Sequence, residues 1–123
     1  MGGVGRRLLL FVLGIAALCL LVAGCGGGGS SSAAAPLGPD DVLVANFSFS
    51  PQTLTVKAGT TVTWRFDQPS SPHNVVSLTT PTVFNSGTPK GTGTFSFTFT
   101  TPGTYPYLCQ VHPSMTGTIV VTP

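Results

Sequence analysis

Near its C-terminus the chain carries a thiol, an imidazole and a thioether at every third position, at Cys109, His112 and Met115, and this spacing limits the folds open to it. All three side chains are ligands that suit a soft transition metal. The sequence contains two histidines, and the other, His73, lies far upstream. A metal site built from all four residues requires a fold that brings two distant loops together. The alternative is that these are ordinary turn and core residues, since Met is often core filler and a lone His usually has a structural role.

Two features of the sequence favour the metal site. Cys109 ends the apolar run Tyr105–Leu108, where a ligand at a strand terminus would lie. Pro113 directly follows His112 and restricts the loop, and each of the two histidines lies in a Pro-flanked segment. Two His and one Cys in a trigonal arrangement, with a weak axial Met, form the donor set of blue copper sites.

The segment Tyr105–Gly117 resembles the copper loop of the cupredoxins, a family of blue copper proteins. The gap of two residues between His112 and Met115 is similar to the short loop of amicyanins, whereas plastocyanins usually have a longer gap. Upstream, Pro72–Val76 resembles the plastocyanin motif that carries the first histidine ligand. The resemblance extends over about residues 42–121 and implies one type 1 copper ion. It implies that His73, Cys109 and His112 are the equatorial ligands and that Met115 is the weak axial ligand.

The resemblance implies a monomeric one-electron carrier that shuttles electrons between redox protein partners outside the cytoplasm. We do not expect an enzyme, because the chain has no Glu and three Asp and offers no acid–base pair. A copper-binding or copper-delivery protein is the first alternative, although such proteins usually use Met-rich or paired-Cys sites and this chain has one Met besides Met1. The second alternative is a metal-free β-sandwich used for adhesion.

Two further residues are candidates for the surroundings of the metal. In the family that the chain resembles, the residue after the first His ligand, here Asn74, ties its loop to the Cys loop by hydrogen bonds and donates its amide to the Cys sulfur. Amicyanin-like loops often have Pro two residues after the Cys, whereas this chain has Val111, which carries an N–H. We therefore predict N–H···S bonds to Cys109 from both amides. The alternative for Asn74 is that it is an ordinary turn residue. The alternative for Val111 is that its side chain simply packs and its amide faces solvent or another acceptor.

The composition favours strands, because 7% of the residues are charged and Thr, Gly and Pro are frequent. The clearest β alternation is Phe95–Thr100. Two other stretches alternate, with inward faces expected at Leu43, Ala45, Phe47 and Phe49 and at Val62, Trp64 and Phe66. About seven or eight short strands without helical periodicity predict an all-β fold, a Greek-key two-sheet β-sandwich of the cupredoxin type over residues 40–123.

Residues 1–24 are predicted to be a signal peptide. Arg6 and Arg7 precede the apolar stretch Leu8–Ala23, which is shorter than the ~20 residues of a membrane span. The stretch ends in Val22–Cys25, which resembles a bacterial lipobox and implies cleavage before Cys25 and a lipid on its thiol. The alternative is an uncleaved N-terminal anchor with an incidental Cys. Either reading predicts a membrane-tethered protein outside the cytoplasm.

Residues 25–39 are expected to form a flexible Gly/Ser-rich linker between the anchor and the domain. With Cys25 lipidated, Cys109 is a lone thiol in an oxidising compartment, and metal binding would give it a role. A Cys25–Cys109 disulfide would require the linker to fold back onto the domain. From Cys25 onward the charges balance, at Lys57, Arg65 and Lys90 against Asp40, Asp41 and Asp67, so the sequence indicates no nucleic-acid partner.

Overall fold

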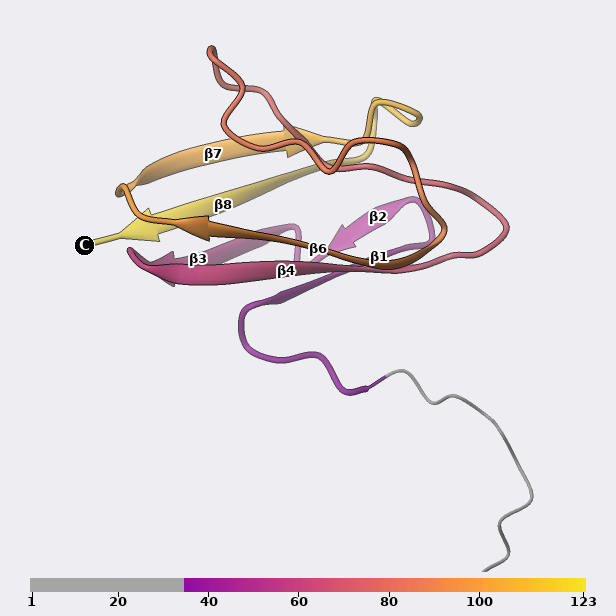
Figure 1. Ribbon diagram of the computed structural model, residues 1–123, viewed down its shortest axis with the longest axis horizontal. Coiled ribbons are helices and arrows are strands. Elements are labelled where there is room, and N and C mark those ends of the chain that lie inside the picture. The colour runs from indigo at the N-terminus through magenta and orange to yellow at the C-terminus, as the bar shows by residue number, and fades with distance from the viewer. Residues whose placement is uncertain (1–34) are drawn as a thin grey trace, which may run out of the picture. The chain divides into compact units, whose positions relative to one another are not determined.

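The computed structural model describes residues 35–123, and within this range all regular structure is β-strand (Figure 1). The eight strands are β1 (Asp41–Ala45), β2 (Ser48–Ser50), β3 (Thr53–Lys57), β4 (Thr60–Asp67), β5 (Val76–Ser77), β6 (Thr92–Phe99), β7 (Gly103–Leu108) and β8 (Thr116–Thr122). They form two four-stranded sheets with the orders β2-β1-β4-β6 and β3-β8-β7-β5. The predicted all-β, two-sheet architecture with seven or eight strands is confirmed.

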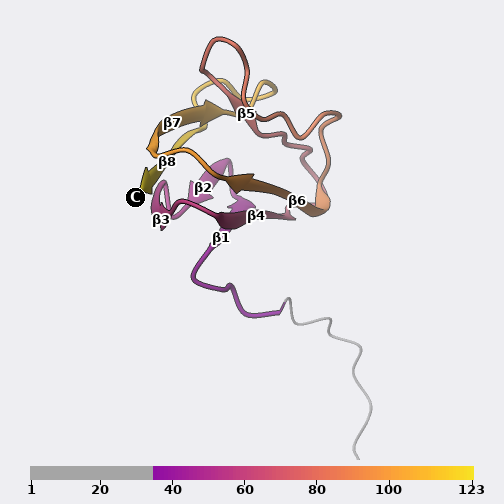
Figure 2. The same cartoon turned by 60° about the vertical axis from the view of Figure 1, so that its left-hand side comes forward.

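Both sheets are mixed. β1 runs parallel to β4 and β3 runs parallel to β8, whereas the other pairs are antiparallel. The layer that contains β7 and β8 lies over the layer that contains β1, β4 and β6 in both side views (Figures 1 and 2). Apolar side chains from alternate positions of both layers fill the space between them, which is the burial that a sandwich needs.

The centre of this core is an aromatic cluster around Trp64, which is fully buried on β4. Its ring lies 5.4–6.4 Å, between centroids, from the rings of Phe84, Phe95, Phe99 and Tyr107. Tyr107, on the opposite sheet, meets the indole edge-on at 5.6 Å. These contacts join the two sheets directly behind the strand that leads to Cys109.

The predicted inward face of the first stretch is wrong in part. Ala45 and Phe49 are buried as expected, but Val42 and Val44 are fully buried as well, and Phe47 is 53% exposed. The reason is a two-residue hairpin: Ala45 pairs with Ser48, and Asn46 and Phe47 have φ values of 51° and 56°. Such left-handed pairs form the type I′ turn that suits the twist of a hairpin. The turn ends the alternation and reverses the chain, so one predicted strand becomes two.

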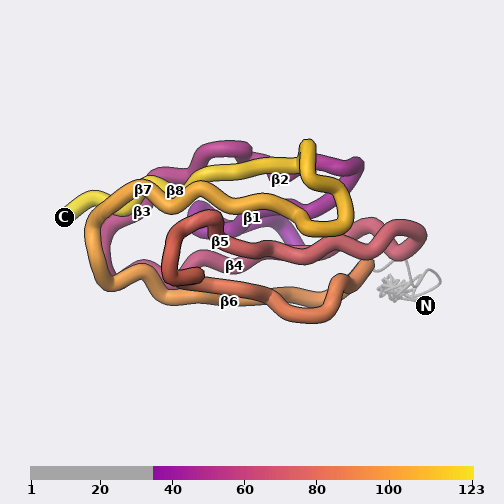
Figure 3. Tube along the Cα trace, turned by 90° about the horizontal axis from the view of Figure 1, so that it is seen from above, coloured from indigo at the N-terminus to yellow at the C-terminus, as the bar shows by residue number. Residues whose placement is uncertain are grey.

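Three connections lie at one end of the sandwich, opposite the C-terminus: the β1–β2 turn, the β4–β5 loop and the β7–β8 loop (Figures 1 and 3). Within the described residues, the structure contains no helix long and apolar enough to cross a membrane. The predicted signal peptide and the predicted lipidation at Cys25 lie outside the described residues, and so does most of the predicted linker.

Candidate metal centre

His73 enters the centre from the β4–β5 loop. Its backbone is fixed by a pair of hydrogen bonds with Lys90, because His73 N donates to Lys90 O at 3.0 Å and Lys90 N donates to His73 O at 2.8 Å. The bridge ties the loop to the segment that leads into β6. The side chain of His73 is fully buried, so its direction is set by the protein and not by water.

Cys109 and His112 come from the β7–β8 loop, which closes on itself through two backbone hydrogen bonds. Met115 N donates to His112 O at 2.8 Å, and Cys109 N donates to Met115 O at 3.0 Å. Cys109 is fully buried at the end of β7, Met115 is 3% exposed, and His112 is half-buried. The tight loop therefore brings the backbones of all three predicted ligands of this segment together.

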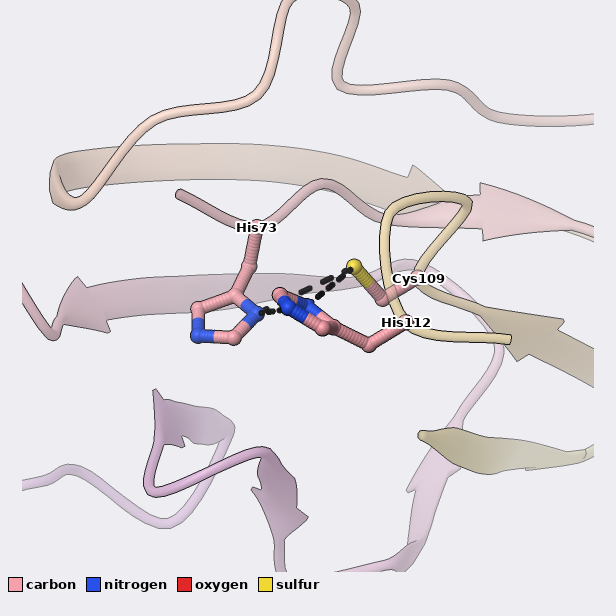
Figure 4. A group of neighbouring side chains, drawn as sticks. All are labelled: His73, Cys109 and His112. Atoms are coloured by element: carbon pink, nitrogen blue, oxygen red, sulfur yellow. Dashed lines mark hydrogen bonds between the residues drawn. The ribbon is translucent and has the colours of Figure 1, made fainter. Parts of the chain in front are cut away.

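The ring nitrogens of the two histidines and the cysteine sulfur converge on one point (Figure 4). Sγ of Cys109 lies 3.8 Å from Nδ1 of His73 and 3.8 Å from Nδ1 of His112, and the two Nδ1 atoms are 3.1 Å apart. Metal bonds of about 2.0 Å to nitrogen and 2.3 Å to sulfur would separate the ligand atoms by about 3.3–3.8 Å. The spacing and the chemistry of this two-nitrogen, one-sulfur set fit a single soft transition-metal ion.

The surroundings of the centre favour the neutral form of His73. Burial, and in second place the nearby positive charge of a protonated His112, lowers the pKa of His73 below its ordinary value. A neutral imidazole has a free lone pair on one ring nitrogen, which a metal ligand requires.

Asn74 connects the two loops that supply the converging atoms. Its Oδ1 accepts a hydrogen bond from Gln110 N at 2.8 Å, and its Nδ2 donates to Gln110 Oε1 at 2.9 Å and to Gly87 O at 3.3 Å. Asn74 is 2% exposed, so these bonds are shielded from water and hold the residue after His73 against the residue after Cys109.

The two predicted N–H···S hydrogen bonds are not present. Within the described chain, the hydrogen bonds of Cys109 Sγ go to the two imidazoles and not to the amide of Asn74 or of Val111. The side chain of Val111 is 44% exposed. Asn74 instead links the two loops through its side-chain amide.

Two residues next to the centre were not predicted as parts of it. Phe47, at the tip of the β1–β2 turn, places its ring edge-on to His73 at 5.7 Å and to His112 at 4.9 Å. Gln68, at the start of the β4–β5 loop, places its Oε1 2.8 Å from Nε2 of His73. The left-handed turn that moves Phe47 out of the core was not recognised, and a single Gln in a polar loop gives no sequence signal for its role.

The comparisons with known proteins agree with this geometry. Residues 14–121 match the Cupredoxin-like domain family. The chain is 34% identical over 118 residues to amicyanin-alpha of Methylorubrum extorquens, which covers 94% of this chain and 98% of that protein. It is 36% identical over 80 residues to amicyanin of Paracoccus denitrificans, which covers 63% of this chain and 61% of that protein.

Solved cupredoxin structures share the fold of this chain at about the same sequence identity as these relatives. A purple cupredoxin from Nitrosopumilus maritimus matches with a TM-score of 0.59 and 33% identity, over 67% of this chain and 98% of that one. Amicyanin from Paracoccus versutus matches with a TM-score of 0.60 and 27% identity, over 71% of this chain and 84% of that one.

Proposed function

The chain belongs to the cupredoxin family, and from this premise we propose that it is a blue copper protein that carries single electrons between redox proteins outside the cytoplasm. The observation that carries the proposal is the convergence of Nδ1 of His73, Sγ of Cys109 and Nδ1 of His112 within 4.8 Å of one another. These three residues and Met115 would hold the ion, which would supply one-electron redox chemistry.

A bound copper ion would supply a one-electron couple between Cu(II) and Cu(I). The protein's part is to hold the ligands in one arrangement for both oxidation states. The Lys90 bridge fixes His73, the two backbone bonds of the β7–β8 loop fix the other ligands, and Asn74 ties the two loops together. Because His73 and Cys109 are fully buried, the sandwich also excludes water from this side of the centre.

His112 is the ligand best placed to pass electrons to a partner, because it is half-buried while His73 and Cys109 are fully buried. Exposed apolar side chains lie near it, at Phe47 and Val111. We expect a redox partner to dock on this end of the monomer. The similarity of the chain to amicyanins supports this role as an electron carrier.

Copper addition to the purified domain tests the proposal. Cu(II) should give an intense blue colour through charge transfer from the thiolate, and this colour should be absent in Cys109→Ser. Circular dichroism of the variant serves as the control for its fold. A wild-type protein that stays colourless with Cu(II) would rule out a blue copper site.

Voltammetry separates an electron carrier from a copper-delivery protein. A carrier should show a fast, reversible couple and keep its copper through repeated cycles, because the tied loops leave little to rearrange. Loss of the copper ion each time the protein is reduced would favour a copper-delivery protein.

We also propose that a lipid on Cys25 anchors the protein to a membrane. The support is the lipobox-like Val22–Cys25, which lies outside the described residues. Cys25→Ala should release the protein from the membrane fraction or block its processing. Unchanged membrane association and an unchanged mass would contradict the anchor.

A further inference from the structure

We propose that Gln68 is a positioning residue that selects the tautomer of His73 and thereby makes Nδ1 the metal-binding atom of this ring. The inference rests on the proposed copper function, since it concerns a proposed ligand. It does not depend on the metal being present, because the contacts that carry it lie within the protein itself.

The first step concerns the two ring nitrogens of His73. A neutral imidazole carries one N–H donor and one acceptor lone pair. Nδ1 faces Cys109 and His112, whereas Nε2 lies 2.8 Å from Oε1 of Gln68. A carbonyl oxygen only accepts hydrogen bonds, so Nε2 must carry the hydrogen. The lone pair is then left on Nδ1, the atom that faces the other two ligands.

The second step concerns the orientation of the Gln68 amide. An amide turned the other way would donate to Nε2 and would force the hydrogen onto Nδ1, where it blocks metal binding. The backbone N–H of Phe47 prevents this, because it lies 3.3 Å from the same Oε1 atom and can only donate. A backbone donor that points at this atom requires the atom to be the amide oxygen, whichever tautomer His73 adopts. Phe47 therefore orients Gln68, and Gln68 orients His73.

The third step explains why Phe47 offers its amide here. Asn46 and Phe47 both adopt left-handed backbone conformations, at φ 51° and 56°. Such a φ is common for Asn but unusual for a bulky residue, and strained positions of this kind cluster at functional sites. The turn delivers two contacts at once, the amide on Gln68 and the ring edge on His73 and His112.

The fourth step concerns what replaces Gln68 when it is removed. His73 is fully buried, so water has no ready access to its Nε2. Without the acceptor, the buried N–H on Nε2 would be left unpaired, which is unfavourable, so the ring would shift toward the other tautomer. The backbone of Gln68 is held separately, because Gln68 N donates to Gly91 O and Gln68 O accepts from Ser71 N. Side-chain substitutions therefore leave the loop's own hydrogen bonds intact.

The experiment uses the metal-free protein and three variants. Gln68→Leu removes the acceptor, Gln68→Glu keeps one, and Lys57→Leu is the matched control on an exposed residue of β3, which pairs with the C-terminal end of β8. Long-range proton–nitrogen NMR of the histidine side chains reports the tautomer. Wild type, Gln68→Glu and Lys57→Leu should show the hydrogen on Nε2 of His73, and Gln68→Leu should show a mixture or the Nδ1–H form.

Copper titration gives the second readout. The affinity for Cu(II) should fall about 10–100-fold in Gln68→Leu, as for other partners of metal-bound His residues, and should be retained in Gln68→Glu. Equal tautomers and equal affinities in wild type and Gln68→Leu would overturn the inference. The inference would also be overturned if His73 of the wild-type protein carried its hydrogen on Nδ1. This result does not depend on whether any variant folds. A wild type with the Nε2–H form that does not bind copper would instead overturn the proposed function.

Discussion

Tyr107 shows how a single residue links the core to alkaline stability. Its side chain is fully buried between the sheets, and neither its hydroxyl nor Nε1 of Trp64 has a hydrogen-bond partner within the described chain. Burial raises the pKa of Tyr107 to about 12, because the phenolate would lose its hydration; in second place the neighbouring Trp64 indole lowers it, although its N–H does not reach the hydroxyl in hydrogen-bond geometry. The residue lies two positions before Cys109, so its packing also supports the end of the strand that carries the thiol.

The raised pKa of Tyr107 predicts a loss of stability at high pH. Below pH ~10 the phenol is neutral in both the folded and the unfolded state. Between pH ~10 and ~12 the unfolded state loses the proton first, so the free energy of unfolding falls as the pH rises. The loss attributable to this group is about 1–1.5 kcal/mol by pH ~11.

Tyr107→Phe isolates this contribution. Because the hydroxyl has no partner, the variant should be as stable as wild type or more so at neutral pH. Denaturant unfolding at pH 9 and pH 11 should then show a smaller drop in the variant. Equal drops in the two proteins would contradict the assignment. The lysines titrate in the same range, but they are common to both proteins and cancel in the comparison.

Some residues of the candidate metal centre can be predicted from the sequence, and others cannot. Cys109, His112 and Met115 were identifiable because thiol, imidazole and thioether recur at a regular spacing within one loop. His73 followed because the chain has one other histidine. Gln68 was not identifiable, since its role arises from where the β4–β5 loop places one oxygen atom, at 2.8 Å from a ring nitrogen. Hydrogen-bond partners from loops have no periodicity to reveal them.

At the scale of the elements, the close pairing of β7 and β8 depends on a residue without a side chain. Gly117 pairs with Tyr107, and its Cα lies against the phenol ring, so that any Cβ placed there would overlap Tyr107. The ring cannot retreat, because Trp64 and Phe49 pack against it at centroid distances of 5.6 and 4.7 Å. Gly117 therefore allows Tyr107 to cross its neighbouring strand and remain in the core.

Gly117→Ala should destabilise the protein by about 1–3 kcal/mol through overpacking. Thr116→Ala is the matched control, since it adds no atoms and changes the exposed neighbour on the same strand. Thermal unfolding of the metal-free proteins measures the difference. A melting temperature of Gly117→Ala within a degree of that of Thr116→Ala would show that the ring can move aside.

Strands were predicted correctly where alternation is uninterrupted and wrongly where a turn has an unusual residue. β6 alternates cleanly, and its three phenylalanines turn toward the core side while Ser96 and Thr98 are exposed. The β1–β2 hairpin misled the prediction because Phe, unlike Gly, rarely occupies a left-handed turn position. The two-residue turn pairs Val44 with Phe49, so the inward positions change from even to odd numbers across it. The apolar residues at odd positions on both sides of the turn hid this change of register.

At the scale of the whole molecule, a bound metal would join loops that belong to different parts of the chain. His73 follows β4, whereas Cys109, His112 and Met115 lie between β7 and β8. Binding to the folded state alone adds about 4 kcal/mol to the free energy of unfolding when the free metal is about 1,000 times the Kd.

Copper should therefore raise the melting temperature in calorimetry, and the rise should depend on the copper concentration. Cys109→Ser should lose most of this rise while its metal-free melting temperature stays close to that of wild type. An identical copper-induced rise in both proteins would place the stabilising metal elsewhere.

The parallel pairing of β3 with β8 has a consequence for the order of folding. β8 is the last strand, yet it is central in its sheet, where it lies between β3 and β7. Such distant pairings close long loops, and folds that depend on them assemble slowly. A nascent chain that lacks Thr116–Thr122 leaves β3 without its partner and β7 paired with β5 alone, and it has no strand to close the Cys109 loop. The centre would then mature only after β8 has joined its sheet, and metal capture would mark a chain in which this strand is in place.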